Sequence, residues 1–82
     1  MGYGGIKYVN GKYDSILFTT ECNYFGEWHF VVDDLLDNEG DRYLLVSFSK
    51  WDKEGRKRAY EKAARFYNSL VPDEWQVSLE EM

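Results

Sequence analysis

Residues 50–71, KWDKEGRKRAYEKAARFYNSLV, are the stretch that decides the fold, because their apolar side chains recur every three or four positions. That spacing is the period of an α-helix with one buried face. The face comprises Ala59, Tyr60, Ala63, Ala64, Phe66, Tyr67, Leu70 and Val71. Ser49 is the expected N-cap, with Asp52 as its capping-box partner, and Pro72 disfavours helical geometry at the residue before it. The pattern predicts one helix ending near residue 70, packed on a sheet.

A hairpin is expected at the start of the chain. KYVNGKYD, at residues 7–14, places Asn10 and Gly11 between two tyrosine-containing runs. Both residues tolerate the positive φ angles of a two-residue hairpin turn. This turn would join strands at about 3–9 and 12–20.

Three further runs have the composition of strands. EWHFVVD, at 27–33, alternates as a half-buried strand does, and RYLLVSF, at 42–48, is apolar enough to be the middle strand of the sheet. EWQVSLE, at 74–80, is expected to form a short closing strand. The order ββββαβ defines an α+β fold, a mostly antiparallel sheet of about five strands with one long helix packed on one face. Residues 1–82 are expected to form a single globular domain.

Composition limits the class of protein. The chain has 82 residues, a net charge of −5 and 18% aromatic residues, which favours an ordered domain. Its single cysteine, Cys22, allows no internal disulfide. No apolar run approaches the roughly 18 residues of a membrane span, and the N-terminus lacks the apolar core of a signal peptide. We expect a cytoplasmic protein without membrane contact.

Basic side chains are concentrated in the helix. Residues 50–65 hold seven of the ten basic residues and a net charge of +4. Three acid–base pairs at i,i+4 spacing, Asp52–Arg56, Glu54–Arg58 and Glu61–Arg65, would neutralise part of this charge. A solvated, ion-paired face is one interpretation, a basic patch for an acidic protein partner is another, and direct nucleic-acid binding is the functional alternative. The residues for that alternative are Lys50, Lys53, Lys57, Arg58, Lys62 and Arg65. The acidic character of the whole chain weighs against it.

A second charged feature lies between the third and fourth expected strands. Its carboxylates are Asp33, Asp34, Asp37, Glu39 and Asp41. Their spacing lacks the glycine at position 6 and the bidentate glutamate of a calcium loop, so no metal site is expected. A solvated turn is one interpretation. The other is a surface that imitates a row of phosphates, with Tyr24, Phe25 and Trp28 as aromatic anchors for a protein partner.

No motif for catalysis or for a cofactor is recognisable. Cys22 and His29, the only cysteine and histidine, come with no signature of an oxyanion hole. GYGG, at 2–5, precedes a strand and does not link a strand to a helix, so it is not a phosphate-binding loop.

We therefore expect a non-enzymatic, acidic protein-binding module without a cofactor. It would be a small inhibitor or regulator of the kind made by phages and mobile elements. Its partner would be a larger nucleic-acid-handling enzyme, such as a CRISPR effector, a restriction enzyme or a polymerase, whose basic surface it covers. An exposed strand edge at 74–79 would also permit a homodimer.

Overall fold

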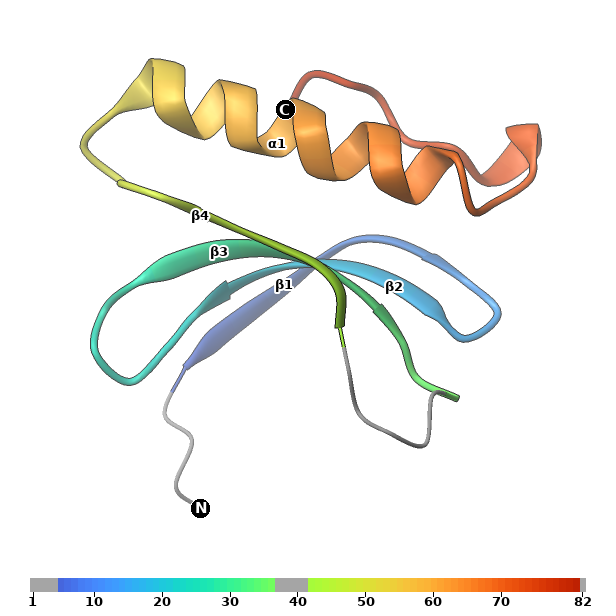
Figure 1. Ribbon diagram of the computed structural model, residues 1–82, viewed down its shortest axis with the longest axis horizontal. Coiled ribbons are helices and arrows are strands. Elements are labelled where there is room, and N and C mark those ends of the chain that lie inside the picture. The colour runs from blue at the N-terminus through green and yellow to red at the C-terminus, as the bar shows by residue number, and fades with distance from the viewer. Residues whose placement is uncertain (1–4, 37–41, 82) are drawn as a thin grey trace.

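The computed structural model describes residues 5–36 and 42–81. Its elements are the strands β1 (Ile6–Tyr13), β2 (Ile16–Cys22), β3 (Trp28–Asp34) and β4 (Arg42–Phe48), the helix α1 (Lys53–Asn68) and the 3₁₀ helix η1 (Asp73–Trp75). The strands form one antiparallel sheet in the order β1-β2-β3-β4, and α1 lies across one face of it (Figure 1). The predicted α+β class and the single helix on an antiparallel sheet are confirmed.

Strand β4 lies at an edge of the sheet, so the prediction of 42–48 as the middle strand is wrong. The central strands are β2 and β3. Leu44, Val46 and Phe48 pack toward the core beneath α1, whereas Leu45 on the other face is 47% exposed. Only four residues separate β4 from the helix, so α1 folds directly back over the strand. The side chains of β4 that face α1 are apolar because the helix covers them.

The first hairpin turns at Asp14 and Ser15, and the prediction of a turn at Asn10 and Gly11 is wrong. Strand β1 continues through Asn10 and Gly11, where the pairing with β2 contains a β-bulge. Asp14 adopts a φ of 53°, and the Ser15 hydroxyl donates to Asp34 Oδ1 over 2.7 Å. The true turn is therefore tied to the end of β3.

Gly11 serves a packing role. A Cβ atom at this position would lie 2.9 Å from Val77 Cγ1 and 3.0 Å from Cε2 of Tyr67. Only a residue without a side chain lets the helix tyrosine and the C-terminal segment approach β1 this closely.

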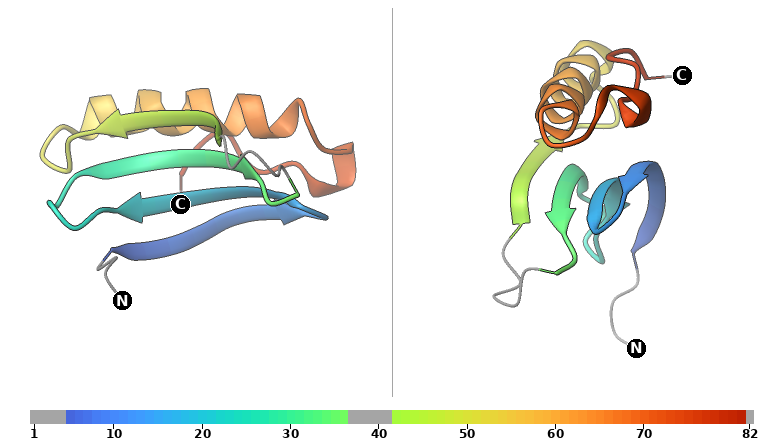
Figure 2. Two further views of the ribbon diagram at one scale, coloured as in Figure 1. Left: turned by 60° about the horizontal axis from the view of Figure 1, so that its bottom comes forward. Right: turned by 90° about the vertical axis from the view of Figure 1, so that its right-hand side faces the viewer.

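Residues 74–80 do not form the expected fifth strand. After η1 the chain runs back along α1 (Figure 2). The Asn68 side chain donates to the Val77 carbonyl over 3.0 Å and accepts from the Val77 amide over 2.9 Å. The Tyr60 hydroxyl donates to the Ser78 carbonyl over 3.1 Å. Helix side chains thus replace a strand neighbour, and the strand edge expected at 74–79 for a homodimer does not form.

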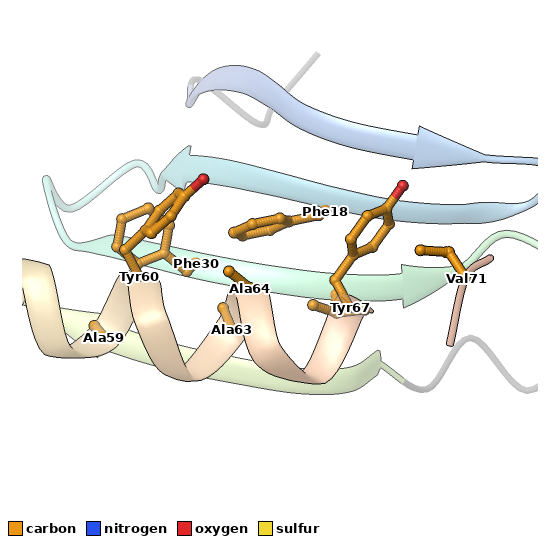
Figure 3. Close-up of a cluster of buried hydrophobic side chains, with 9 residues drawn as sticks. Phe18, Phe30, Ala59, Tyr60, Ala63, Ala64, Tyr67 and Val71 are labelled. Carbon is orange, nitrogen blue, oxygen red and sulfur yellow. The ribbon is translucent and has the colours of Figure 1, made fainter. Parts of the chain in front are cut away.

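The core lies between α1 and the sheet (Figure 3). Its buried side chains are Phe18, Phe30, Val32, Ala59, Tyr60, Ala63, Ala64, Tyr67 and Val71. Tyr60 and Tyr67 project from α1 on either side of Phe18, with ring centroids 5.4 and 5.7 Å from that of Phe18. The predicted buried face of the helix is confirmed, with Phe66 and Leu70 packed at its margin. Alanines between the tyrosines let the helix approach the sheet closely.

The helix begins at Lys53 with Asp52 as its N-cap, so the expected capping role of Ser49 is wrong. The Gly55 amide donates to Asp52 Oδ1 over 2.9 Å. Ser49 instead accepts the Trp51 amide on its hydroxyl and the Asp52 amide on its carbonyl. Ser49 therefore shapes the turn that precedes the cap.

Candidate functional site

The turn between β2 and β3 displays two aromatic side chains to solvent. Tyr24 is 74% exposed and Phe25 is 83% exposed. Their rings lie edge to face with centroids 5.7 Å apart. Side chains of this size normally reduce their contact with water by packing into a core. Two adjacent exposed rings are therefore a candidate binding surface.

This turn holds its shape through Asn23. The Asn23 carbonyl oxygen Oδ1 accepts from the amides of Phe25 and Glu27, each over 2.9 Å. The Asn23 side-chain amide donates to Glu27 Oε1 over 2.8 Å. Gly26 has a φ of 83°, a conformation that favours glycine. The backbone is thus organised before any partner arrives, which lowers the entropic cost of binding.

A third exposed aromatic lies at the same end of the sheet. Trp28 pairs with Phe48, so the turn before β3 and the connection after β4 lie at one end, as Figure 2 shows. That connection carries Trp51, which is 85% exposed, with the Lys50 ammonium group 5.1 Å from its ring centroid. We call Tyr24, Phe25 and Trp51 the aromatic end. Trp51 was not among the predicted anchors, although its position in a polar stretch before a helix could have indicated exposure.

The acidic residues lie at the opposite end of β3. Asp33 and Asp34 are the last residues of that strand. At the usual rise per residue of a strand, they lie about 20 Å from the turn that carries Tyr24 and Phe25. Asp34 Oδ1 accepts from the Ser15 hydroxyl and the Leu36 amide, so this carboxylate also organises the local backbone. The other three predicted carboxylates, Asp37, Glu39 and Asp41, lie outside the described residues. The structure does not bring the acidic and aromatic candidates together.

Trp28 faces the helix side of the sheet and is half-buried. Its ring lies nearly parallel to that of Tyr8, with centroids 6.3 Å apart and an angle of 10° between planes. It also contacts Phe48, with centroids 6.3 Å apart. Trp28 therefore lines a cleft beside α1 and is not part of the aromatic end.

The outer face of α1 keeps most of its positive charge. Lys53, Lys57, Arg58 and Lys62 are exposed, and none of them forms an ion pair with another described residue. Of the three expected i,i+4 ion pairs, one is present in the described part of the chain, between Glu61 and Arg65 at 2.9 Å. Asp52 caps the helix, and Arg56 pairs elsewhere. The helix is less neutralised than its spacing predicts.

The Arg56 side chain points toward the sheet and forms an ion pair with Glu81. Its Nε and Nη2 atoms donate to the two carboxylate oxygens of Glu81, each over 2.7 Å. The guanidinium carbon lies 5.0 Å from the ring centroid of Phe48 and 5.9 Å from that of Phe30. The hydrogen bonds that Arg56 donates to Glu81 raise the pKa of Arg56, although burial opposes the shift. Local spacing offers no signal for a pair separated by 25 positions.

The Arg56–Glu81 pair forms one wall of a cleft of about 330 Å³. Its lining residues are Tyr8, Asn10, Thr20, Trp28, Arg56 and Glu81. A second depression of about 340 Å³ lies on the other side of the pair, lined by Lys53, Arg56, Lys57, Glu80 and Glu81. Aromatic, polar and cationic groups therefore converge around one guanidinium group.

Cys22 and His29 lie on opposite faces of the sheet. Cys22 pairs directly with Trp28 and so shares its face, whereas His29 is the next residue along and points to the other face. His29 Nδ1 lies 3.0 Å from the Ser47 hydroxyl oxygen. A cysteine–histidine dyad is therefore not assembled from these two residues.

No protein-family model matches this chain, and neither the search of curated proteins nor the search of solved structures finds a match. Within residues 5–36 and 42–81, no helix is long and apolar enough to cross a membrane.

Proposed function

We propose that this chain is a non-enzymatic protein-binding module that anchors its partner on the Tyr24–Phe25 turn. The observation that carries the proposal is the pair of aromatic rings, 74% and 83% exposed, on a turn stiffened by Asn23. Tyrosine and other aromatic residues dominate the binding energy of protein interfaces, and a rigid backbone reduces the entropy lost on association.

A protein is a better partner for this turn than a nucleic acid. Aromatic platforms for single strands normally sit in a positive groove that follows the backbone phosphates. The charged residue within this turn is Glu27, and the whole chain carries −5. Negative charge beside the rings favours a partner with basic or neutral groups around an apolar pocket.

The narrower proposal is that the partner is a nucleic-acid-handling enzyme whose basic surface is covered, as by a phage or mobile-element inhibitor. A standard interface covers about 800 Å² on each partner, a patch about 30 Å across. Such a patch can include both the aromatic turn and Asp33 at the far end of β3. A larger partner could thus use the rings for affinity and the carboxylates for fast association.

The test is affinity capture from nuclease-treated lysate, read by mass spectrometry. The double variant Tyr24→Ser/Phe25→Ser is expected to lose a specific protein that the unaltered chain retains. The matched control is Val9→Ser, which removes an apolar side chain that is 62% exposed on the edge strand β1. A partner lost equally from both variants, or kept by both, would contradict the role of the turn.

Direct nucleic-acid binding is the second candidate, and the observation in its favour is the row of exposed cations on α1. Replacing Lys57, Arg58 and Lys62 by glutamine is expected to abolish such binding. The binding constant would fall steeply with added salt, because each phosphate contact releases counterions. A binding constant that does not change between 50 and about 200 mM salt would exclude this candidate.

A further inference from the structure

Two depressions on the molecule share one wall, the Arg56–Glu81 pair. On the sheet side, the cleft of about 330 Å³ is lined by Asn10 and Thr20 among other residues. On the helix side, the depression of about 340 Å³ contains Lys53 and Lys57. If the Glu81 side chain moves away, the two become one groove with Arg56 at its centre.

The groove is built to hold an anion. Lys53, Arg56 and Lys57 are spaced three and four residues apart, so they lie on one side of α1. The anion now present is the Glu81 carboxylate, bound in the bidentate geometry that a guanidinium group also uses for phosphate. Glu80 lines the same depression. The chain thus supplies its own carboxylate to a cationic site.

The sheet side of the groove offers a flat aromatic surface and hydrogen-bonding groups. Tyr8 is 55% exposed, and its ring lies within 10° of parallel to that of Trp28. The Asn10 amide nitrogen donates to the Thr20 hydroxyl oxygen over 2.7 Å. Among the described residues, no hydrogen bond uses the carbonyl oxygen of the Asn10 side chain. That oxygen can accept a hydrogen bond from the edge of a planar ligand.

Glu81 can leave without disturbing the core. Leu79 is the last hydrophobic residue of the C-terminal segment that packs against the core cluster. Beyond it, the backbone amide of Glu80 donates to the Ser78 hydroxyl oxygen, and Glu81 is held through its side chain. Moving this side chain costs the ion pair with Arg56.

We propose that the groove binds a nucleoside phosphate, with the phosphate on Arg56 and the base against Tyr8 and Trp28, and that Glu81 competes with it. A planar ring joined to a phosphate matches the two chemistries that meet here, stacking on an aromatic ring and bidentate binding to a guanidinium group. The proposal does not depend on protein binding by the aromatic turn, since the two sites use different residues.

The test measures quenching of Trp28 fluorescence by adenosine monophosphate. Trp51 and Trp75 are changed to phenylalanine in every protein compared, so that Trp28 is the only reporter. Glu81→Gln is expected to bind the nucleotide at least tenfold more tightly, because the competing carboxylate is gone. Glu74→Gln is the matched control, since it removes the same charge from the C-terminal segment outside both depressions, and its affinity is expected to stay unchanged.

Two further variants separate the site from a general charge effect. Lys57→Gln, an exposed substitution, is expected to weaken binding several-fold, whereas Lys62→Gln, farther along the helix, is expected to leave it unchanged. Near-ultraviolet circular dichroism verifies that each variant is folded. Absence of quenching at millimolar nucleotide in Glu81→Gln, or equal effects of Glu81→Gln and Glu74→Gln, would overturn the proposal.

The source of the nucleoside phosphate is distinguished with three further probes. A free nucleotide site predicts that adenosine monophosphate binds more tightly than a short single-stranded oligonucleotide with a 5′-phosphate. A site for strand ends predicts the reverse order, and the same oligonucleotide without its phosphate is expected to bind weakly in both cases. Inorganic phosphate that competes as well as the nucleotide would show that the rings contribute nothing and would overturn the assignment of a nucleoside.

Discussion

Gly11 is a residue of β1 that lies close to Tyr67 of the helix and to Val77 of the C-terminal segment. Its backbone φ is not among the positive angles, so alanine would fit the local backbone and would gain about 0.4–1 kcal/mol by restricting the unfolded chain. The added Cβ would nevertheless lie 2.9 Å from Val77 Cγ1 and 3.0 Å from Cε2 of the Tyr67 ring. Overpacking of this kind costs about 1–3 kcal/mol.

We therefore expect Gly11→Ala to lower the free energy of unfolding by about 1–2 kcal/mol, measured by urea denaturation. The cost should be smaller in a Val77→Ala background, because one of the two crowded atoms is then missing. A gain in stability from Gly11→Ala alone would show that the close contact does not exist in solution.

Tyr67 and Tyr60 have similar burial but different hydroxyl environments. Within the part of the chain that the structure describes, the Tyr67 hydroxyl has no hydrogen-bond partner, whereas the Tyr60 hydroxyl donates to the Ser78 carbonyl. Tyr67→Phe is expected to keep or raise stability at pH 7, because an unsatisfied buried polar group is removed. Tyr60→Phe is expected to lower it by about 1 kcal/mol. Equal effects of the two substitutions in urea denaturation would contradict this difference.

The environment of Tyr67 also predicts that the stability of the fold depends on pH in the alkaline range. Burial raises the pKa of Tyr67 above its ordinary value of 10.0. Because the folded pKa exceeds the unfolded one, the stability linked to the neutral hydroxyl is fully present below pH 10.0 and is lost as the pH rises through the folded pKa. Between pH 9 and about 11, Tyr67→Phe should lose less stability than the unaltered chain, as followed by thermal unfolding. Identical losses would exclude Tyr67 as the titrating group.

At the scale of the element, the helix start is decided by a cap. Asp52 accepts the Gly55 amide, while Ser49 accepts the Trp51 amide one turn earlier. Asp52→Ala is expected to lower the free energy of unfolding by about 1 kcal/mol, the usual value of an N-cap. Ser49→Ala should cost less than about half of that. The reverse order in urea denaturation would restore Ser49 as the cap.

The β2–β3 turn shows what an element adds to a sequence pattern. Tyr24 and Phe25 follow one strand pattern and precede another, next to Gly26, so their place in a turn was predictable. The stiffness of the turn was not, because it comes from the Asn23 side chain bonding to two backbone amides. The separation of the rings from Asp33 and Asp34 was predictable, because the expected strand at 27–33 lies between them.

At the scale of the whole molecule, the order of the strands predicts where the structure is most protected. Strands β2 and β3 have hydrogen-bonded neighbours on both sides, whereas β1 and β4 each have one. Amide hydrogen exchange should be slowest in β2 and β3 and faster at alternate residues of 42–48. Uniformly slow exchange throughout 42–48 would mean that this strand lies inside the sheet, as its composition had indicated.

The amino-acid sequence by itself determined the local features of this protein. The buried face of α1 and the existence of β3 and β4 follow from residue periodicity, because a helix or strand repeats over neighbouring positions. The exposure of Tyr24 and Phe25 also follows from neighbouring residues, because they lie in a short turn between two strand patterns. Each of these depends on a few adjacent side chains.

Only the tertiary structure decided how these elements combine. The edge position of β4, the packing role of Gly11 and the pairing of residues 77–81 with α1 all join residues far apart in the chain. Arg56 and Glu81 are 25 positions apart, and nothing in the local pattern of either relates it to the other. The sequence predicted an ion pair between Arg56 and Asp52, four positions earlier, but the Asp52 carboxylate caps the helix and the Arg56 guanidinium group pairs with Glu81.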